Sequence, residues 1–262
     1  MRSDEISDGT NSTLYLIIVY EGDTKMINRE QLYFLSRNYG AELDEIALDR
    51  FDKYAEILTE WNSFMNLTAI TQPDEIIKKH FIDSLSVLTA VSIPEGASLI
   101  DVGTGAGFPG IPLLIARNDL KVTLLDSTNK RLDFIRAVLE NIGLEAKVVH
   151  MRAEEAGKNP DFREKYDFAT ARAVANLRDL SEYCLPFVKR GGYFLSMKGS
   201  KAEEEIPTAK KAIHILGGEI EDKISFDIGE VGERMIVKIK KISQTPTKYP
   251  RASAKIAKFP IE

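Results

Sequence analysis

The chain has 262 residues, of which 44% are hydrophobic and 29% are charged, and its formal net charge is −5. This length allows one large α/β domain with a modest addition, and the composition is ordinary for a soluble globular protein. A single cysteine, Cys184, excludes an internal disulfide framework and fits a reducing cytoplasm. The three histidines have no spacing typical of a metal site, so the sequence predicts no metal.

The first residues of the chain contain one apolar run, Leu14–Tyr20. It is far shorter than the ~20 residues that span a bilayer. It follows acidic residues and lacks both a basic region and a cleavage site, which argues against a signal peptide. The run fits either an added strand or an upstream extension of a protein that begins near Met26. We expect residues 1–27 to be a weakly ordered or peripheral extension, and we expect a cytoplasmic protein without membrane contact.

Residues 28–95 predict a helical region. Asn28–Asn38 fits a first helix with Asn28 as its cap. A second helix carries a continuous apolar stripe with steps of four and three residues. The stripe predicts packing against the main domain: Ala47, Phe51, Tyr54, Leu58, Trp61 and Met65.

A third helix is expected over Pro73–Ala90. His80 and Asp83 share a face of it, where they could form a local hydrogen bond or line the mouth of a site. We place a domain boundary near Gly96, within a proline- and glycine-containing turn.

After this turn, apolar strands and helices alternate strictly, which predicts a doubly wound parallel sheet with right-handed crossovers. The strands are expected at Ser98–Val102, Val122–Leu125, Lys147–His150, Tyr166–Thr170 and Tyr193–Met197. Two consecutive strands, Glu219–Phe226 and Met235–Ile242, then form a closing hairpin. A Rossmann-like sheet of seven strands with an antiparallel edge strand resembles the class I S-adenosylmethionine-dependent methyltransferases. The predicted methyltransferase domain spans residues 96–243, and residues 244–262 form a basic tail.

The stretch Leu99–Pro112 joins the first strand to a helix through a glycine-rich turn. Its Gly105–Gly110 part matches the dinucleotide fingerprint G-x-G-x-x-G, and Asp126 follows about 20 residues later. Asp101 before the turn suits a ligand with an ammonium and a sulfonium better than a pyrophosphate. The bulky Phe108 also lies where a pyrophosphate would press on the helix. These features and the closing hairpin favour S-adenosylmethionine over a dinucleotide.

Further polar residues follow the other strands. Asp126 can accept the two ribose hydroxyls of an adenosine or can cap the next helix. Glu154, after Ala153, lies where such folds contact adenine, although it could be simply solvated. Arg172 ends the fourth strand and could hold a substrate phosphate or the cofactor carboxylate. Lys198 ends the fifth strand on the same rim.

The C-terminal part of the chain is basic and lacks acidic residues from Arg234 to Lys258. This run fits either a solvated surface or an edge that contacts phosphates. Its cations are Arg234, Lys238, Lys240, Lys241, Lys248, Arg251, Lys255 and Lys258.

Two motifs that mark other classes of methyltransferase are missing, and their absence narrows the reaction class. The fourth strand is not followed by the D/N-P-P-Y/F tetrad of amine methyltransferases, and no cysteine nucleophile is placed for attack on a pyrimidine carbon. An acceptor that attacks without covalent help remains, such as N7 of guanine, which has a lone pair and no proton to lose. Catalysis would then consist of positioning, without a general base.

Several motifs occur together and in order over about Asn28–Ile261. They are Asn66-Leu67-Thr68, His80 with Asp83-Ser84-Leu85, the glycine stretch of residues 101–112, Leu125-Asp126-Ser127 with Lys130-Arg131, Arg152-Ala153-Glu154-Glu155, Ala171-Arg172-Ala173-Val174-Ala175, Lys198-Gly199 and Tyr249-Pro250-Arg251. This set closely resembles the RsmG (GidB) family of bacterial 16S ribosomal RNA guanine-N7 methyltransferases. Two departures are visible: residues 1–26 have no counterpart, and Ala252–Lys255 replaces a glycine-containing turn.

The resemblance implies S-adenosylmethionine as cofactor and guanine 527, in the 530 loop of the small ribosomal subunit, as acceptor. It implies cofactor contacts by Gly103, Phe108, Ala153, Glu154 and Arg172. The residues at the ends of the first two strands add three further candidates: Asp101, Gly105 and Asp126. Candidates for RNA contact are Arg172, Lys198 and Arg251. We expect a monomer. The alternatives are a small-molecule methyltransferase of the same fold and a non-catalytic nucleotide- or RNA-binding module.

Overall fold

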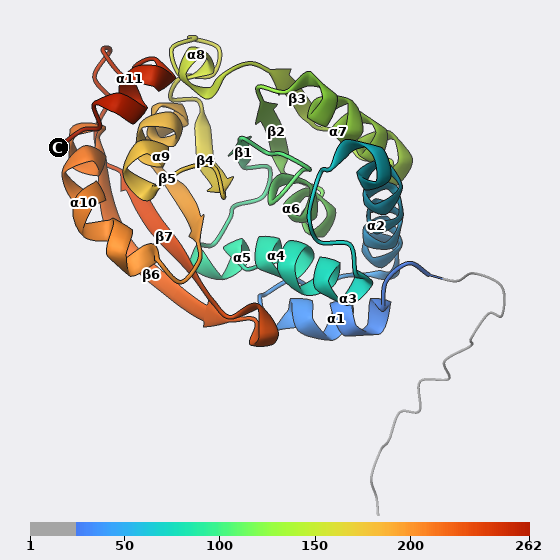
Figure 1. The fold of residues 1–262 in the computed structure, drawn as a ribbon. Helices are drawn as coiled ribbons and strands as arrows, with labels where there is room; N and C mark the ends of the chain where they lie inside the picture. Colours follow the sequence, from blue (N-terminus) through green and yellow to red (C-terminus); the bar gives the residue numbers. More distant parts are fainter. Residues whose placement is uncertain (1–24) are drawn as a thin grey trace, which may run out of the picture.

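The structure, a computed structural model, describes residues 25–262, so the apolar run Leu14–Tyr20 lies outside the described residues. A twisted seven-stranded sheet crosses the molecule with helices on both faces (Figure 1). The strands are β1 (Ser98–Val102), β2 (Lys121–Asp126), β3 (Lys147–His150), β4 (Tyr166–Arg172), β5 (Val188–Lys198), β6 (Gly218–Asp227) and β7 (Glu233–Lys241).

The sheet has the order β3-β2-β1-β4-β5-β7-β6. The strands β1 to β5 are parallel, and the predicted doubly wound α/β fold with a final antiparallel hairpin is confirmed. One detail of the prediction is wrong, because the antiparallel strand β7 lies between β5 and β6 and the edge strand is β6. Burial explains this placement. Most residues of β7 are buried or half-buried, whereas most residues of β6 are exposed, so the more apolar strand of the hairpin takes the inner position.

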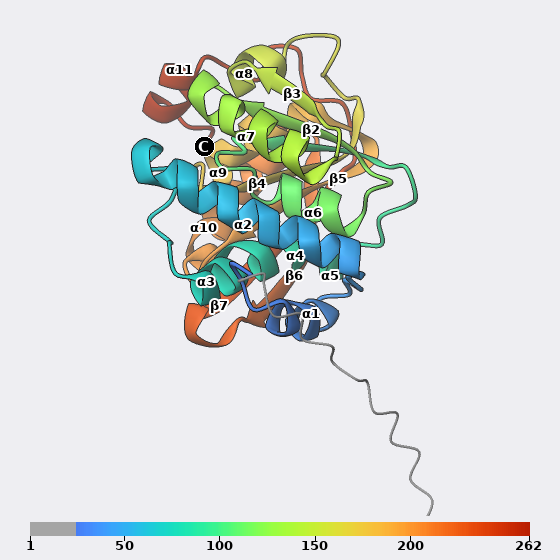
Figure 2. The same ribbon diagram turned by 90° about the vertical axis from the view of Figure 1, so that its right-hand side faces the viewer.

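One face of the sheet is covered by the N-terminal helices together with the helices that follow β1 and β2. Figure 2 shows the long helix α2 lying across this face. Apolar side chains of all these helices except α3 form one continuous cluster with this face of the sheet. The helices are α1 (Arg29–Arg37), α2 (Glu45–Met65), α3 (Pro73–Glu75), α4 (Asp83–Leu85), α5 (Val87–Ala90), α6 (Gly110–Ala116) and α7 (Asn129–Ile142).

The local chemistry of the first helices is as predicted. The Asn28 side chain accepts a hydrogen bond from the Gln31 backbone N–H and thereby caps α1. In α2 the stripe residues Phe51, Tyr54 and Leu58 are fully buried, which confirms packing against the main domain. The helix expected over residues 73–90 is interrupted, because its central part, Ile76–Ile82, is a π-helix (η1). Such wide turns occur often at functional sites.

The other face of the sheet packs against the second half of the chain, which forms a separate apolar cluster. Its helices are α8 (Ala153–Ala156), α9 (Leu177–Cys184), α10 (Ala202–Ile215), α11 (Ser253–Lys258) and the short 3₁₀ helices η2 (Leu185–Phe187) and η3 (Gly229–Val231). Among residues 25–262, no helix is both long enough and apolar enough to cross a membrane. No group of three or more metal-binding side chains occurs in the same described range.

Candidate cofactor and substrate site

The site lies at the carboxyl ends of the parallel strands. The chain runs from β1 to β2 on one side and from β4 to β5 on the other, so a crevice opens at this edge between β1 and β4. A cavity of about 700 Å³, here called the first cavity, occupies it. It is lined mainly by the turn after β1, by the ends of β2 and β4, by the start of α8 and by α11.

The glycine turn is shaped by close packing behind it. Gly107 has a positive φ of 95°, and a Cβ there would lie 2.6 Å from Ile111 and 2.8 Å from the Tyr54 hydroxyl. At Gly110 a Cβ would lie 2.3 Å from Leu124, so only glycine lets α6 approach β2 this closely. The predicted strand–turn–helix element is therefore present, with Gly103 and Gly105 on the cavity wall.

Asp101 lies behind the turn and not on the cavity wall. Its Oδ2 accepts hydrogen bonds from the Thr104 hydroxyl at 2.6 Å and from the Gly110 backbone N–H at 2.9 Å. Burial raises the pKa of this carboxyl to about 6. The Asp101 carboxylate therefore joins the beginning of the turn, at Thr104, to its end, at Gly110. Its predicted contact with the cofactor stays a prediction.

Asp126 lies on the wall of the first cavity, as expected. Its Oδ2 accepts a hydrogen bond from the Gly105 backbone N–H at 3.0 Å, and its Oδ1 accepts one from the Thr128 N–H at 2.8 Å. Arg131 also lies near Oδ2, at 3.7 Å. The carboxylate thus supports the start of α7, and each of its oxygens keeps a second lone pair, so both uses foreseen from the sequence are compatible.

Ala153 and Glu154 begin the short helix α8 and line the first cavity. Both are half-buried. The structure therefore brings Gly103, Gly105, Phe108, Asp126, Ala153, Glu154 and Arg172 together around one cavity.

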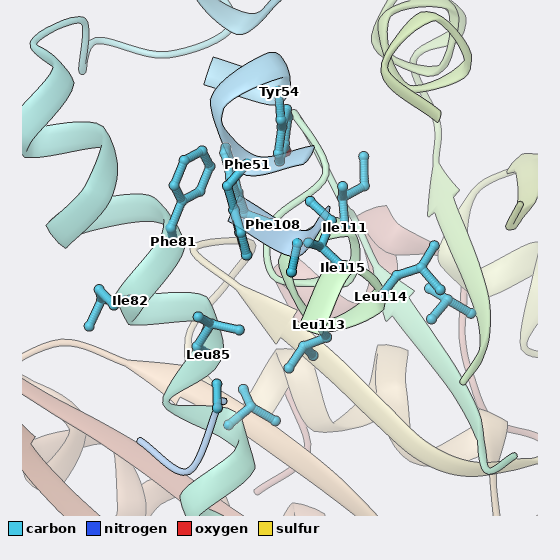
Figure 3. Packing of buried hydrophobic residues seen from close by; sticks show 14 of the residues in the cluster. Phe51, Tyr54, Phe81, Ile82, Leu85, Phe108, Ile111, Leu113, Leu114 and Ile115 are labelled. Carbon is cyan, nitrogen blue, oxygen red and sulfur yellow. The ribbon is translucent and has the colours of Figure 1, made fainter. Parts of the chain in front are cut away.

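Phe108 joins the glycine turn to the N-terminal helices (Figure 3). Its ring is stacked on His80, with centroids 4.3 Å apart, and on Tyr54, at 5.4 Å. The Tyr54 hydroxyl also donates a hydrogen bond to the Ala106 carbonyl of the turn. The turn is thereby held from the side of α2 and η1.

Arg172, at the end of β4, is fixed by η1 and α4. Its guanidinium donates a hydrogen bond to Asp83 at 2.8 Å and to the Lys79 carbonyl at 3.2 Å, and it lies 4.9 Å from the Phe108 ring centre. Asp83 also pairs with Arg234 of β7 at 3.2 Å. Of the two residues expected on one helix face, His80 lines the first cavity, whereas Asp83 is buried and binds Arg172.

His80 is held neutral between these groups. The Arg172 guanidinium can only donate, so the 3.3 Å contact makes His80 Nδ1 an acceptor. The proton then lies on Nε2, which donates to the Thr68 hydroxyl at 2.9 Å. Burial and the positive charge of Arg172 lower the pKa of His80 to about 3. The network gives Thr68 of the Asn66-Leu67-Thr68 motif a structural role, because its hydroxyl accepts the hydrogen bond from His80 Nε2.

Beside the first cavity lies a second cavity of about 670 Å³. The two cavities share His80, Arg172 and the segment Ala173–Ala175 as a common wall. The second cavity also contains Lys198, whose ammonium group pairs with Glu205 of α10 at 2.7 Å. Lys198 therefore lies on the rim of β4 and β5, as expected.

The basic C-terminal run is largely paired within the protein. Lys241 is fully buried and Arg251 is bound by the buried Glu182, while Lys238 and Lys240 both pair with Glu221. Neither of the two interpretations of this run, a solvated surface or a phosphate-contacting edge, holds for Lys241, because its side chain is fully buried. The exposed cations of the run are Lys248, Lys255 and Lys258.

Three features of the site escaped the sequence analysis. The first is the hydrogen bond of the Tyr54 hydroxyl to the turn, because Tyr54 belongs to an apolar stripe that predicts only packing. A buried tyrosine normally needs a hydrogen-bond partner, which was the available signal. The Asp83–Arg234 pair joins residues 151 positions apart, and no pattern connects them. The third is Glu205, which is one of three consecutive glutamates at the start of α10, so nothing in the sequence separates it from the other two.

The strand order, the glycine turn at the switch point and the closing hairpin define a class I methyltransferase fold. The family model described as rRNA small subunit methyltransferase G matches residues 47–231. The protein of that name from Acetivibrio thermocellus is 53% identical over 226 residues, covering 85% of this chain and 92% of the relative. The one from Lachnoclostridium phytofermentans is 48% identical over 227 residues, covering 86% and 94%. This chain therefore belongs to the GidB family of rRNA small subunit methyltransferases G.

Proposed function

We propose that the protein transfers a methyl group from S-adenosylmethionine to N7 of a guanine in 16S ribosomal RNA. Family membership supports the rRNA methyltransferase class. The observation that carries the choice of cofactor is the first cavity, where a glycine turn, the Asp126 carboxylate and the start of α8 face one space at the switch point. By the family resemblance, the acceptor is guanine 527 in the 530 loop.

The residues of the first cavity fit this cofactor chemically. Each oxygen of Asp126 accepts one backbone N–H, so each keeps a lone pair for a ribose hydroxyl. Ala153 and Glu154 form the part of the wall proposed to contact adenine. Phe108 and Gly103 support the turn, and the Arg172 cation is available to a carboxylate or an RNA phosphate. When bound, S-adenosylmethionine supplies an electrophilic methyl group on a sulfonium.

The protein contributes orientation more than acid–base chemistry. Guanine N7 carries a lone pair and loses no proton, so no general base is needed. The wall of His80 and Arg172 is rigid, because His80 is buried, Arg172 is half-buried and both side chains are hydrogen-bonded in one network. Holding donor and acceptor in line at such a wall lowers the entropic part of the barrier. RNA contacts are proposed for Arg172, Lys198 and Arg251. Because ribosomal RNA is the proposed substrate, we expect the protein to act in the cytoplasm. We also expect it to be a monomer.

The test is methyl transfer to the proposed atom. The protein is incubated with labelled S-adenosylmethionine and 30S particles that lack the modification, and particles that already carry it are the control. We expect label at N7 of guanine 527 in the first sample alone. Label at another atom or nucleotide would refute the assignment. Turnover with small metabolites and indifference to removal of residues 243–262 would favour the small-molecule alternative.

A further inference from the structure

The second cavity offers a place for the methyl acceptor, provided that the protein has the proposed function. This cavity adjoins the first one along His80, Arg172 and Ala173–Ala175. If the donor occupies the first cavity, the acceptor atom has to reach this shared wall. The second cavity, about 670 Å³ in volume, lies on the far side of the wall and has room for a purine nucleotide.

A donor and an acceptor lie side by side in the second cavity. Lys198 Nζ donates to the Ala175 carbonyl at 2.7 Å and pairs with Glu205 Oε2 at 2.7 Å, which leaves one of its three N–H groups for a ligand. Glu205 Oε2 also accepts a hydrogen bond from the Leu177 backbone N–H. Its second oxygen, Oε1, makes no hydrogen bond with any residue in the range 25–262. The side chain of Glu205 keeps 27% of its surface exposed, against 9% for Lys198.

This pair matches the Watson–Crick edge of guanine. Guanine presents an acceptor, O6, beside two donors, N1–H and the N2 amino group. A phosphate offers only acceptors, which a carboxylate repels, and adenine presents a donor and an acceptor in the reverse order. N7 lies on the other side of O6, away from N1 and N2. A guanine bound by Lys198 and Glu205 therefore keeps N7 free to face the shared wall.

We propose that the second cavity receives the acceptor guanine, with Lys198 donating to O6 and Glu205 Oε1 accepting from N1–H and the N2 amino group. The two residues also shape the wall itself. Lys198 holds the Ala175 carbonyl, and Glu205 holds the Leu177 N–H. Between Arg172 and Ala175 the backbone passes through Ala173, which has a positive φ of 56°. The same pair thus binds the base and keeps this turn in place.

The charge change of the reaction agrees with this arrangement. The N7 lone pair forms the new N–C bond, and the C–S bond breaks with its electron pair going to sulfur. The purine becomes cationic, and no proton is lost. The second cavity is lined by the carboxylates Glu205 and Asp83 and by the cations Lys79, Arg172, Lys198 and Arg234. Asp83 is already paired with Arg172 and Arg234, so Glu205 is the carboxylate that faces the cationic purine. Since the cationic purine is a stronger N1–H donor, its bond to Glu205 strengthens as the methyl group is transferred, which is the condition for faster chemistry.

The test removes the N2 amino group from the substrate. Small subunits are reconstituted with inosine in place of the target guanine, and kcat/KM is measured with the full-length protein. We expect the wild type to prefer guanine by about tenfold or more, because the lost bond ends on a carboxylate. In Glu205→Ala the ratio of kcat/KM for guanine to that for inosine should fall to about one, and in Glu205→Gln to an intermediate value of about three.

The matched control is Glu203→Gln, in the same helix, where the carboxylate is exposed and pairs with Lys223. It should keep the wild-type preference. Thermal unfolding and S-adenosylmethionine affinity are measured for each variant. If Glu205→Ala does not fold, the wild-type preference and Glu205→Gln decide the question. A wild type indifferent to inosine, or a Glu205 variant with the full preference, would overturn the inference. A wild type that methylates neither substrate would instead refute the proposed function.

Discussion

The two cavities of the site are built in different ways. The first cavity takes most of its wall from strand ends and the turns directly after them, and much of that wall is backbone. The second cavity is formed by side chains of η1, α4, β4, β5, α10 and β7, and many of these are charged. The shape of a site made from a turn depends on whether the backbone can pack closely against the residues behind it. The shape of a site made from ion pairs depends on whether residues far apart in the sequence come within contact distance. The variants below test this distinction.

The largest effect is expected for Gly107→Val, on the first cavity. A side chain there combines a positive φ with contacts below 3 Å to Ile111 and Tyr54, so we expect a loss of about 4 kcal/mol or more. Urea unfolding and S-adenosylmethionine binding are the measurements. The control is Gly96→Val, which has a positive φ of 68° in open space and should cost about 1–2 kcal/mol. Equal losses in the two variants would show that packing behind the turn is unimportant.

A slightly smaller effect is expected for Arg172→Gln, at the wall between the cavities. The change takes one cation away from Asp83, a carboxylate whose side chain is only 6% exposed. We expect a loss of about 3 kcal/mol in the free energy of unfolding and a fall in kcat/KM of at least a hundredfold.

The control for this variant is Arg136→Gln, which breaks an exposed pair with Asp133. It should cost less than about 0.5 kcal/mol and leave activity unchanged. A stable, fully active Arg172→Gln would show that the network at the wall is dispensable.

The third prediction concerns pH and Asp101. Its pKa rises from 3.8 to about 6 in the folded protein, so the unfolded state loses this proton first as the pH rises. Its contribution to stability is therefore complete below pH 4 and declines between pH 4 and pH 6, by up to about 3 kcal/mol. Asp101→Asn has no titratable group at this position. The free energy of unfolding of the wild type minus that of the variant should therefore fall as the pH rises over that range. A difference that stays constant from pH 4 to pH 7 would contradict the assigned burial.

The smallest effect on stability is expected for Lys255→Ala, on the exposed part of the basic tail. The change should alter the free energy of unfolding by less than about 0.5 kcal/mol. If this lysine contacts a phosphate, the salt dependence of RNA binding should weaken by about one unit in the log–log slope. Lys211→Ala, an exposed lysine of α10, is the control. An unchanged slope in Lys255→Ala would remove this lysine from the RNA-binding surface.

Much of the first cavity could be predicted from the sequence. The turn from Leu99 to Pro112 carries its own geometry, because glycines at fixed positions after an apolar strand specify a tight turn at a strand end. Asp126 is the last residue of β2, Glu154 lies in the short helix soon after β3, and parallel strands bring their carboxyl ends to one edge. Their place beside the turn therefore follows from the strand order alone.

Whether the Asp101 side chain faces the cavity or the packed interior could not be predicted in this way. Alternation along a strand determines that neighbouring residues face opposite sides, but only the packed structure shows which side is the cavity. Arg251 is a similar case. In the sequence it is one cation in a basic run, and in the structure the buried Glu182 binds it.

The sequence by itself determined the strands of the sheet and the glycine turn, because these depend on local backbone preferences and on periodic apolar positions. The family followed from motifs that occur together and in order, which the sequence also contains. The tertiary structure alone decided the inner position of β7, the pairing of Asp83 with Arg172 and Arg234, and the Lys198–Glu205 pair. Those contacts join residues far apart in the chain. Their energies depend on burial and distance, which no local pattern encodes.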